Sequence, residues 1–524
     1  MSSPEYVAVT LHLAKKLKEA SPKQYMAVFH VMSAGQRDCL KRSSSQPQTR
    51  SSWSWNDPSF VKLPISSQNT IRVVDLEKKD RVVVVHPKWE IIQEHLTNIQ
   101  CSFCLAPDIK HVEYGKLMKK TISKYQFAKA RGYNFQLLDD PGIAEKLKVC
   151  LPFIVKHALD LETRLAKPIP ILESGRSQTL LLSRNLCCSL LANAFFCTFP
   201  EESRGNLPDF NFFRLFHKVE NDARSIVKVE KLKCILEYFC QMRDSNHDKN
   251  TVISFERRCV TEHVQWKESN AKLCPVVVKR KSGIEDAEGM LQVDFANKVI
   301  GGGVLNDGAV MEEIRFVTSP ELIVARLFTE PLNHQEVLVV TGTRKFSSYS
   351  GYSAAFQFGG PCPLETRNID DLGREVTQVV AMDAYPFHEC NKWEQYSQEM
   401  IDRELHKCFV AFRKAKGNPQ AVATGNWGCG AFNGDPELKF LIQWMAASEV
   451  KRSRMFYHTC FNDKQSKELK DINEFLIQTE VTVGKLYRCL LSYKEGGKVK
   501  SRSRIPIFPY IKDRIVLGAL FANK

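Results

Sequence analysis

Two adjacent glutamates, Glu312 and Glu313, follow closely on three consecutive glycines, Gly301–Gly303. Because glycine has no side chain, such a loop lets the backbone approach an anion and turn its N–H groups toward it. A helix beginning near Met311 would add the positive end of its dipole at the same place. The pattern predicts an anion site beside two carboxylates; the alternative is a tight turn followed by an ordinary helix start.

The two glutamates are not expected to form a symmetric acid/base pair, because neighbouring side chains on a helix point in different directions. Two roles on one ligand fit better: one carboxylate positions a hydroxyl and the other transfers a proton. A neighbouring carboxylate or a bound diphosphate would raise the pKa of such a general acid, as proton donation requires. The loop has neither the GxxxxGK[ST] nor the GxGxxG pattern of common nucleotide-binding loops.

A second glycine-rich segment, Thr424–Asp435, interleaves four glycines with Asn426, Trp427 and Phe432. It follows an apolar run and precedes a helical pattern at 436–449. Two such loops at two strand ends suit a diphosphate better than a single phosphate. The alternative is a purely structural turn of glycines and aromatic residues.

A third segment places Tyr349 and Tyr352 shortly after Thr341-Gly-Thr343. Small residues followed by tyrosines suggest a mobile loop that closes on a ligand.

The elements that must position these loops come after residue 256, where short apolar runs alternate with helical patterns. Strands are expected at 276–278, 291–295, 337–340, 379–382 and 421–424. Helices are expected at 319–329, with Ser319 as N-cap and Pro320 in the first turn, and at 395–415 and 436–449. This alternation predicts an α/β core with a parallel or mixed sheet, in which ligands bind at the carboxyl ends of the strands.

The preceding region, 66–255, is predicted to be mainly helical, with helical patterns at 88–99, 143–166, 177–196 and 226–242 and a short strand at 82–85. Residues 1–65 are basic and polar, as in a flexible extension. We therefore divide the chain into an extension (1–65), a helical accessory domain (66–255) and a catalytic domain (256–524).

The composition bounds the class of protein. The 524 residues carry 74 Lys+Arg against 59 Asp+Glu, a net charge of +15, and 43% are hydrophobic. This excludes a wholly disordered chain, a collagen and a small disulfide scaffold, and favours polyanionic partners. The 17 cysteines are scattered, which is typical of thiols in a reducing compartment. Cys101 and Cys104 with His111 do not complete a four-ligand zinc site, so we expect no metal.

Several of these segments resemble the catalytic signature of poly(ADP-ribose) glycohydrolases. The similarity extends over roughly residues 66–510, and its segments are 191–200, 208–212, 291–297, 301–303 with 312–313, 320–330, 351–352 and 425–432. The resemblance implies a macrodomain-like α/β/α core with a mixed sheet behind an N-terminal helical accessory domain. It implies hydrolysis of ribose–ribose O-glycosidic bonds in poly(ADP-ribose), with release of ADP-ribose and no metal or other cofactor.

The resemblance also implies a role for each matching residue. Glu313 would be the general acid and then the base, Glu312 would hold the ribose hydroxyls, and Asp294 and Asn297 would shape the site. Ile284 and Glu285 would recognise adenine, Tyr352 would close over the ligand and Phe432 would order the ribose. The diphosphate would be held by Gly301, Gly302, Gly303, Asn426, Trp427, Gly428, Cys429, Gly430 and Ala431.

This chain departs from the family pattern at Met311, where the family has Gln, and at Asn306-Asp307, which adds an acid to the glycine loop. An aromatic expected at a strand end falls on Cys460 or Phe461. Two functions follow: an active glycohydrolase, or an ADP-ribose-binding or poly(ADP-ribose)-binding protein whose catalysis is weakened or lost. The expected partners are poly(ADP-ribose) and ADP-ribosylated proteins. We expect no sequence-specific nucleic acid and no membrane, and a monomer in the nucleus, the cytoplasm or both.

Overall fold

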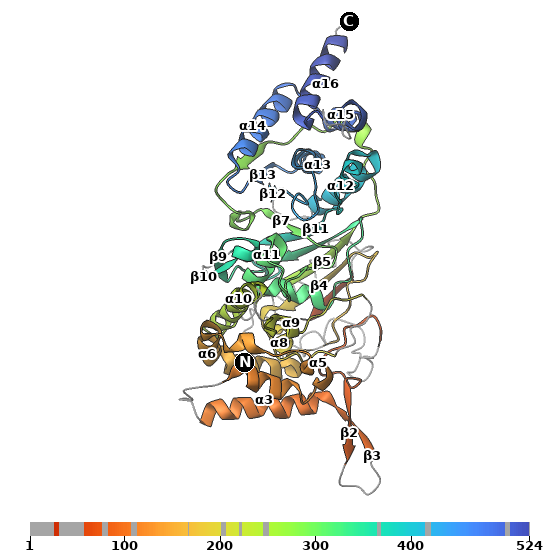
Figure 1. Ribbon diagram of the computed structural model, residues 1–524. Coiled ribbons are helices and arrows are strands. Elements are labelled where there is room, and N and C mark those ends of the chain that lie inside the picture. The colour runs from red at the N-terminus through yellow and green to blue at the C-terminus, as the bar shows by residue number, and fades with distance from the viewer. Residues whose placement is uncertain are drawn as a thin grey trace.

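A mixed β-sheet forms the centre of the protein in a computed structural model (Figure 1). The structure describes residues 26–30, 57–75, 82–105, 113–165, 167–200, 206–219, 223–244, 251–363, 368–413, 421–497 and 504–522. Within them the sheet has nine strands, in the order β1 (Met26–His30), β4 (Gln178–Ser183), β5 (Val252–Cys259), β8 (Glu336–Thr341), β11 (Gln378–Asp383), β7 (Leu291–Ala296), β12 (Ala421–Gly425), β13 (Arg454–His458) and β6 (Val276–Lys279).

The sheet is parallel at its two ends and antiparallel between them. β11, β7, β12, β13 and β6 run parallel to one another, whereas β5 and β8 pair antiparallel with their neighbours. All six residues of β8 and of β11 are buried. Alternate residues of β8 enter different cores, with Leu338 and Val340 on one face and Val337 and Val339 on the other. The predicted α/β core with a mixed sheet is therefore confirmed.

Helices cover both faces of the sheet. On one face lie α12 (Gln398–Phe412), α13 (Pro436–Glu449), α14 (Asp463–Gln478), α15 (Val483–Gly496) and α16 (Ile507–Ala522). On the other lie α11 (Met311–Thr318), the 3₁₀ helix η6 (Pro320–Leu327) and the helices of the first half of the chain. The predicted helices at 395–415 and 436–449 correspond to α12 and α13, and Asp435 caps α13 by accepting bonds from the N–H groups of Glu437 and Leu438.

The first half of the chain is mainly helical, and Figure 1 shows most of its helices at one end of the molecule, beside the hairpin of β2 (Thr70–Asp75) and β3 (Val82–Pro87). Its helices are α3 (Lys88–Leu105), α4 (Tyr114–Ile122), α5 (Phe127–Arg131), α6 (Pro141–Leu159), α7 (Leu161–Arg164), α8 (Arg184–Phe195), α9 (Phe213–Phe216) and α10 (Arg224–Asp244). The 3₁₀ helix η3 (Gln136–Asp139) links α5 to α6.

Two sequence predictions need correction. The stretch 177–196 is not one helix: Gln178–Ser183 is β4, and only Arg184–Phe195 is helical. The Leu180–Leu182 run lies between two pairing strands and is buried on both sides, so its apolar pattern fits a central strand as well as a helix. The segment 319–329 is a 3₁₀ helix, and the Ser319 hydroxyl caps no N–H group.

Part of the predicted extension belongs to the folded core. Val61 and Leu63 are buried, and the Val61 N–H donates to the carbonyl of Ile169. β1 pairs with β4 at the edge of the sheet. The rest of 1–56 lies outside the described residues.

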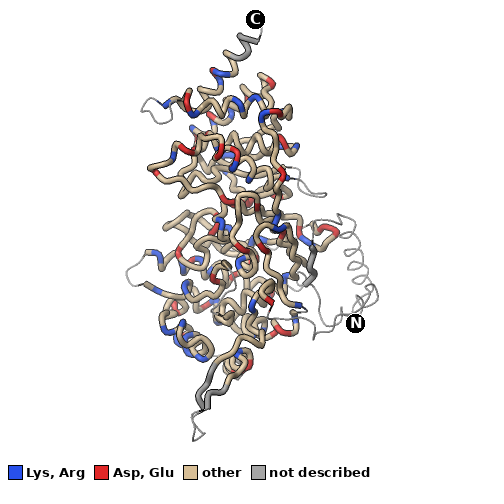
Figure 2. The backbone as a smooth tube through the Cα atoms, turned by 90° about the vertical axis from the view of Figure 1, so that its right-hand side faces the viewer, with Lys and Arg blue, Asp and Glu red and all other residues tan. Residues whose placement is uncertain are grey.

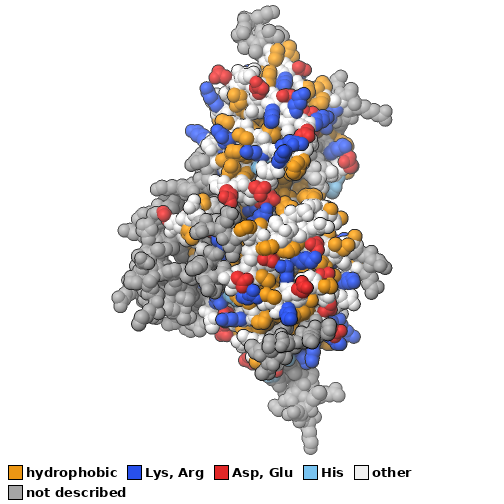
Figure 3. All heavy atoms as spheres, turned by 90° about the vertical axis from the view of Figure 1, so that its left-hand side faces the viewer, with side chains coloured by type: hydrophobic (Ala, Val, Ile, Leu, Met, Phe, Trp, Pro, Cys, Tyr) orange, Lys and Arg blue, Asp and Glu red, His pale blue; other side chains and the backbone are white. Residues whose placement is uncertain are grey.

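Lys and Arg occur along the whole length of the tube in Figure 2, interspersed with Asp and Glu. Figure 3 shows the same mixing of charged and apolar side chains on one face of the molecule. No helix among the described residues is long and apolar enough to cross a membrane. The described cysteines are all free thiols.

Candidate active site

The two glycine-rich loops lie at one edge of the sheet. Gly301–Gly303 follow β7, and the segment after Gly425 follows β12. β7 and β12 are adjacent and parallel, so their carboxyl ends meet at the same edge. α11 begins at Met311 beside them, as predicted.

The N–H groups of the first loop hold the two glutamates. Glu312 accepts from Gly301 at 2.6 Å and from Asn297 at 2.9 Å. Glu313 accepts from Gly303 at 2.8 Å and from Val310 at 3.0 Å. Both side chains are buried, at 3% and 7% exposure. The sequence predicted N–H groups turned toward an anion, and the anions that they hold here are the two carboxylates.

Gly302 lies directly against both carboxylates. A Cβ atom there would collide with Glu313 Oε1 and lie 2.8 Å from Glu312 Oε2, and its φ of +43° is one that L residues rarely adopt. Only glycine therefore lets the two glutamates meet over this loop.

Asp294 adds a third buried carboxyl group beside the pair. Neither of its oxygens has a hydrogen-bond partner among the described residues. Burial raises the pKa of Asp294 to about 8, although Arg315 opposes the shift, and Glu313 adds to it. Burial and the charge of Asp294 also raise the pKa of Glu312 well above its usual range. Asp294 and Glu312 therefore favour holding a proton between them over carrying two separate negative charges.

Two cations hold the first loop from behind. Lys231 of α10 donates to the carbonyls of Gly303 at 3.1 Å, Asn306 at 2.9 Å and Gly308 at 2.6 Å. Arg326 of η6 donates to the carbonyls of Ile300 at 2.7 Å and Gly302 at 3.1 Å. Because the Ile300 and Gly302 carbonyls turn to Arg326, the N–H groups of Gly301 and Gly303 in the same peptide units can face the glutamates, while Lys231 holds the rest of the loop.

The second loop is fixed by its buried residues and open at its tip. Trp427 is fully buried, donates to the carbonyl of Met382 and lies under the ammonium of Lys439 at 4.2 Å. Asn426 accepts from Tyr457 and Gln465. At the tip, Gly430 and Ala431 are exposed, and within the described chain their N–H groups donate to no acceptor.

The remaining residues of the second loop support its shape. Gly428 has a φ of +73°, and its carbonyl accepts from Gly434. Cys429 donates its thiol to the carbonyl of Trp427. Phe432 is partly buried and packs against the core behind α13.

The predicted adenine residues lie near Met311. Ile284 and Glu285 belong to the 3₁₀ helix η5 (Ile284–Asp286), and Ile284 clusters with Ala287 and Ala423. Met311 packs against this cluster, and its sulfur accepts from the N–H of Phe295 at 3.3 Å. Met311 therefore satisfies a backbone donor even though it lacks the amide of the family glutamine.

Glu285 is held as an anion by its neighbours. Tyr349 donates its hydroxyl to Glu285 at 2.7 Å, and the Lys345 ammonium lies 3.8 Å away. Burial opposes ionisation, but these groups and the N–H of Glu285 itself outweigh it and lower the pKa of Glu285. Tyr352 accepts from the N–H of Met311 at 3.2 Å and is 56% exposed, so it stands at the surface over the start of α11.

The departures from the family pattern have definite positions. Asp307 pairs with Arg224 of α10 at 3.4 Å. Phe461 is 66% exposed, and it and Cys460 both have positive φ. Within the described residues no group of His, Cys, Asp and Glu could hold a metal ion; the side chain of Cys104 and all of His111 lie outside them.

Several residues at the site were not foreseen from the sequence. These are Lys231, Arg326, Arg315 with its partner Gln292, and Lys439. A sequence signal existed for Lys231, because it lies on the same helix face as Val227 and Ile235, both buried. A lysine on an apolar face needs a buried acceptor, but the sequence does not show which one.

Comparison with known proteins agrees with this architecture. The model of the poly(ADP-ribose) glycohydrolase helical domain matches residues 144–257, and the model of its macro domain fold matches 263–468. The chain is 30% identical over 486 residues to the probable poly(ADP-ribose) glycohydrolase 2 of Arabidopsis thaliana, covering 80% of this chain and 90% of that protein. It is 31% identical over 422 residues to poly(ADP-ribose) glycohydrolase 1 of the same plant, covering 66% and 75%.

A nematode relative extends the comparison. Poly(ADP-ribose) glycohydrolase 1 of Caenorhabditis elegans is 34% identical over 330 residues, which are 60% of this chain and 40% of that protein. The alignment with the first plant relative covers 90% of that protein. The family models together with these relatives place the chain in a known group of glycosidases: it belongs to the poly(ADP-ribose) glycohydrolase family.

Proposed function

We propose that this protein hydrolyses the ribose–ribose O-glycosidic bonds of poly(ADP-ribose) and releases ADP-ribose, with Glu313 as general acid and base. The observation that carries the proposal is the pair of buried glutamates held by glycine N–H groups at the carboxyl edge of β7. The relatives named above support the same reaction, and ADP-ribosylated proteins are the expected carriers of the polymer. We expect the protein to act as a monomer in the nucleus, the cytoplasm or both.

In the first step, Glu313 donates its proton to the ribose oxygen that leaves as the glycosidic bond breaks. Each Glu313 oxygen accepts one N–H bond, and a carboxyl oxygen that carries a proton can still accept such a bond. In the second step, water attacks the anomeric carbon and returns a proton to Glu313. The products are free ADP-ribose and a polymer shortened by one unit, and Glu313 is again protonated.

Glu312 and Asp294 serve substrate placement in this proposal. Glu312 is held at both oxygens, so its orientation is fixed before the substrate binds. Its remaining lone pairs accept from the ribose hydroxyls, and Asp294 beside it keeps a proton in the cluster. Asn297 contributes its N–H to Glu312, and its side chain braces the turn by accepting from Val299.

The open tip of the second loop supplies the diphosphate contacts. Gly430 and Ala431 are exposed at the tip of a loop whose base is fixed by Trp427, and in this proposal their N–H groups donate to the diphosphate. Their dipoles would stabilise the diphosphate, whose charge assists the oxocarbenium-like transition state of glycoside cleavage. Gly301–Gly303 contribute by holding the glutamates, Tyr352 covers the ligand and Phe432 lies beside the ribose.

The test is Glu313→Gln, which keeps the side-chain shape and removes the proton donor. We expect release of ADP-ribose from labelled polymer to fall at least about 10²-fold, the typical contribution of general acid–base catalysis. ADP-ribose itself should still bind. Glu389→Gln, at a side chain that is 77% exposed, is the matched control.

Two results would contradict parts of this proposal. Full activity of the Glu313→Gln variant would remove Glu313 from the mechanism. A wild-type protein that binds ADP-ribose but releases none from the polymer would instead be the catalytically inactive binding protein.

A further inference from the structure

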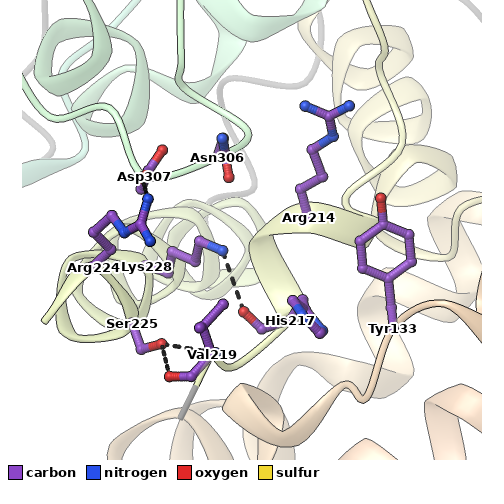
Figure 4. A pocket seen from close by; sticks show the side chains of 9 residues that line it. All are labelled: Tyr133, Arg214, His217, Val219, Arg224, Ser225, Lys228, Asn306 and Asp307. Atoms are coloured by element: carbon purple, nitrogen blue, oxygen red, sulfur yellow. Dashed lines mark hydrogen bonds and ion pairs between the residues drawn. The ribbon is translucent and has the colours of Figure 1, made fainter. Parts of the chain in front are cut away.

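A pocket lies between the accessory helices and the first glycine loop. It has a volume of about 270 Å³ and is lined by Tyr133, Arg214, His217, Arg224 and Lys228 from the accessory region and by Asn306 and Asp307 from the loop (Figure 4). Figure 4 shows these side chains arranged around one space, with Asp307 turned toward Arg224.

Basic side chains predominate among the described residues that line the pocket. They are Arg214, Arg224 and Lys228, and the one carboxylate among those described residues is Asp307, which pairs with Arg224 at 3.4 Å. Arg214 is exposed and has no charged partner among the residues that the structure describes. α10 begins at Arg224 and runs for 21 residues, so the positive end of its dipole also lies here. Such a pocket favours an anion.

The pocket and the glutamates share one loop. Glu313 bonds to the N–H of Gly303, whose carbonyl bonds to Lys231, and Lys231 bonds in turn to Asn306. Following these contacts through standard backbone dimensions places the Asn306 carbonyl within about 12 Å of the Glu313 carboxylate. A polymer repeat of two riboses, a diphosphate and an adenine extends over at least this separation.

We infer that this pocket binds the diphosphate of an ADP-ribose unit next to the one being cleaved. The inference rests on the proposed function. The volume is below the range of about 300–1,000 Å³ that encloses whole ligands, so the pocket suits a diphosphate and part of a ribose rather than a complete unit. DNA fits less well, because single strands follow extended basic grooves with stacking aromatics, whereas these cations surround one small space.

The experiment compares a short poly(ADP-ribose) oligomer with the ADP-ribose monomer. Binding is measured on the full chain carrying Glu313→Gln, with and without the pair Arg214→Gln/Arg224→Gln. Both arginines are exposed, so their loss should leave the fold intact. The pair Lys267→Gln/Lys272→Gln removes the same charge at two exposed side chains of the catalytic half, both before β6 and away from the residues that line the pocket.

We expect the pocket variant to bind the oligomer about tenfold more weakly and the monomer unchanged. The slope of log affinity against log salt for the oligomer should decrease in magnitude by about 1.4, as for two lost phosphate contacts on a single strand. Inorganic pyrophosphate should compete with the oligomer in the parent and have less effect in the pocket variant. The control pair should leave both affinities unchanged.

Three outcomes would overturn the inference. The pocket variant could bind the oligomer as tightly as the parent does. The control pair could weaken binding equally, which would make the effect one of net charge. Single-stranded DNA of equal charge could compete as well as the oligomer, which would indicate a general polyanion surface. A parent that binds neither oligomer nor monomer would instead refute the proposed function.

Discussion

Replacing Lys231 with Met should reduce catalysis far more than stability. The ammonium of Lys231 makes three hydrogen bonds to the loop that carries Gly303, Asn306 and Gly308. Bonds to charged groups contribute about 1.5–3 kcal/mol each. Burial opposes them: it lowers the pKa of Lys231 from 10.5 to about 7, a cost of about 5 kcal/mol at 1.36 kcal/mol per pKa unit.

These opposing quantities leave a net stabilisation of about 0–4 kcal/mol. Methionine keeps the length of the side chain, so the main loss is the position of the loop and hence of Glu313. A displacement of about 1 Å can reduce the rate about 10²-fold. We expect kcat for ADP-ribose release to fall by about that factor while KM changes little, and Tm to fall by only a few degrees.

The pH dependence gives Lys231 a second signature. Because its folded pKa is lowered, the unfolded chain binds more protons between pH 7 and 10.5, so the stability contributed by this group rises with pH in that window. Activity should fall over the same range, because a neutral amine has fewer donors for the three carbonyls. The carboxyl groups of Glu313 and Asp307 and the cations of Lys228 and Arg326 act on Lys231 in the folded state.

The assay is release of ADP-ribose against pH for wild type, Lys231→Met and Lys233→Met. Lys233 is on the same helix and pairs with Glu230, with 25% exposure, so its variant should match wild type. A role for Lys231 in holding the loop would be refuted if the Lys231→Met variant had the kcat of wild type. It would also be refuted if wild type and Lys231→Met lost activity equally above pH 7.

Three further expectations concern the carboxylates and their surroundings. Gly302→Ala should abolish most activity, because the new Cβ would collide with Glu313. Gly175→Ala is the control for backbone strain alone, because Gly175 has a φ of +83° and a Cβ there would have no atom within 4 Å. Equal losses of turnover in the two variants would contradict the explanation by collision. In wild type, the raised pKa of Asp294 contributes stability that is complete below pH 3.8 and lost as pH rises through about 8. Asp294→Asn should therefore make Tm less dependent on pH over this range. An unchanged slope of Tm against pH would show that Asp294 does not titrate there. Met311→Gln should change turnover by less than about tenfold, since the Met311 sulfur already satisfies Phe295; a larger gain would show that Met311 weakens the enzyme.

The sequence predicted the parts of the site that are local in the chain. The glycine loop, the glutamate pair, the start of α11 and the second loop after β12 all lie within short segments, and their neighbourhood follows from parallel strands. The sequence did not show that the Gly301 and Gly303 N–H groups hold the two carboxylates, because this depends on Arg326 binding the Ile300 and Gly302 carbonyls of the same peptide units and on Lys231 holding the rest of the loop. Lys231 lies 72 residues before Gly303, in a helix for which the sequence suggested no chemistry.

Most of the predicted strands are short apolar runs, and β7 was predicted even though Asp294 lies within it. β5 and β13 were missed: Arg257 and Arg258 interrupt the apolar pattern of β5, and β13 begins with Arg454. The sheet tolerates Arg257 because its buried guanidinium pairs with Glu336 of the neighbouring strand and also donates to the carbonyls of Leu172, Glu330 and Pro331. Such a pair becomes visible only when the two strands are adjacent.

Strands β4 and β5, from the accessory half of the chain, belong to the central sheet. β5 pairs with β8 along six residue positions, from Ser254 to Cys259. A polypeptide beginning at residue 263 would lack β5, so the buried strand β8 would become an unpaired edge of the sheet. Glu336 would also lose its buried partner, the guanidinium of Arg257. The sheet therefore continues across the boundary between the two matched domains, and a fragment cut there would expose an unpaired strand edge and aggregate instead of forming a minimal enzyme.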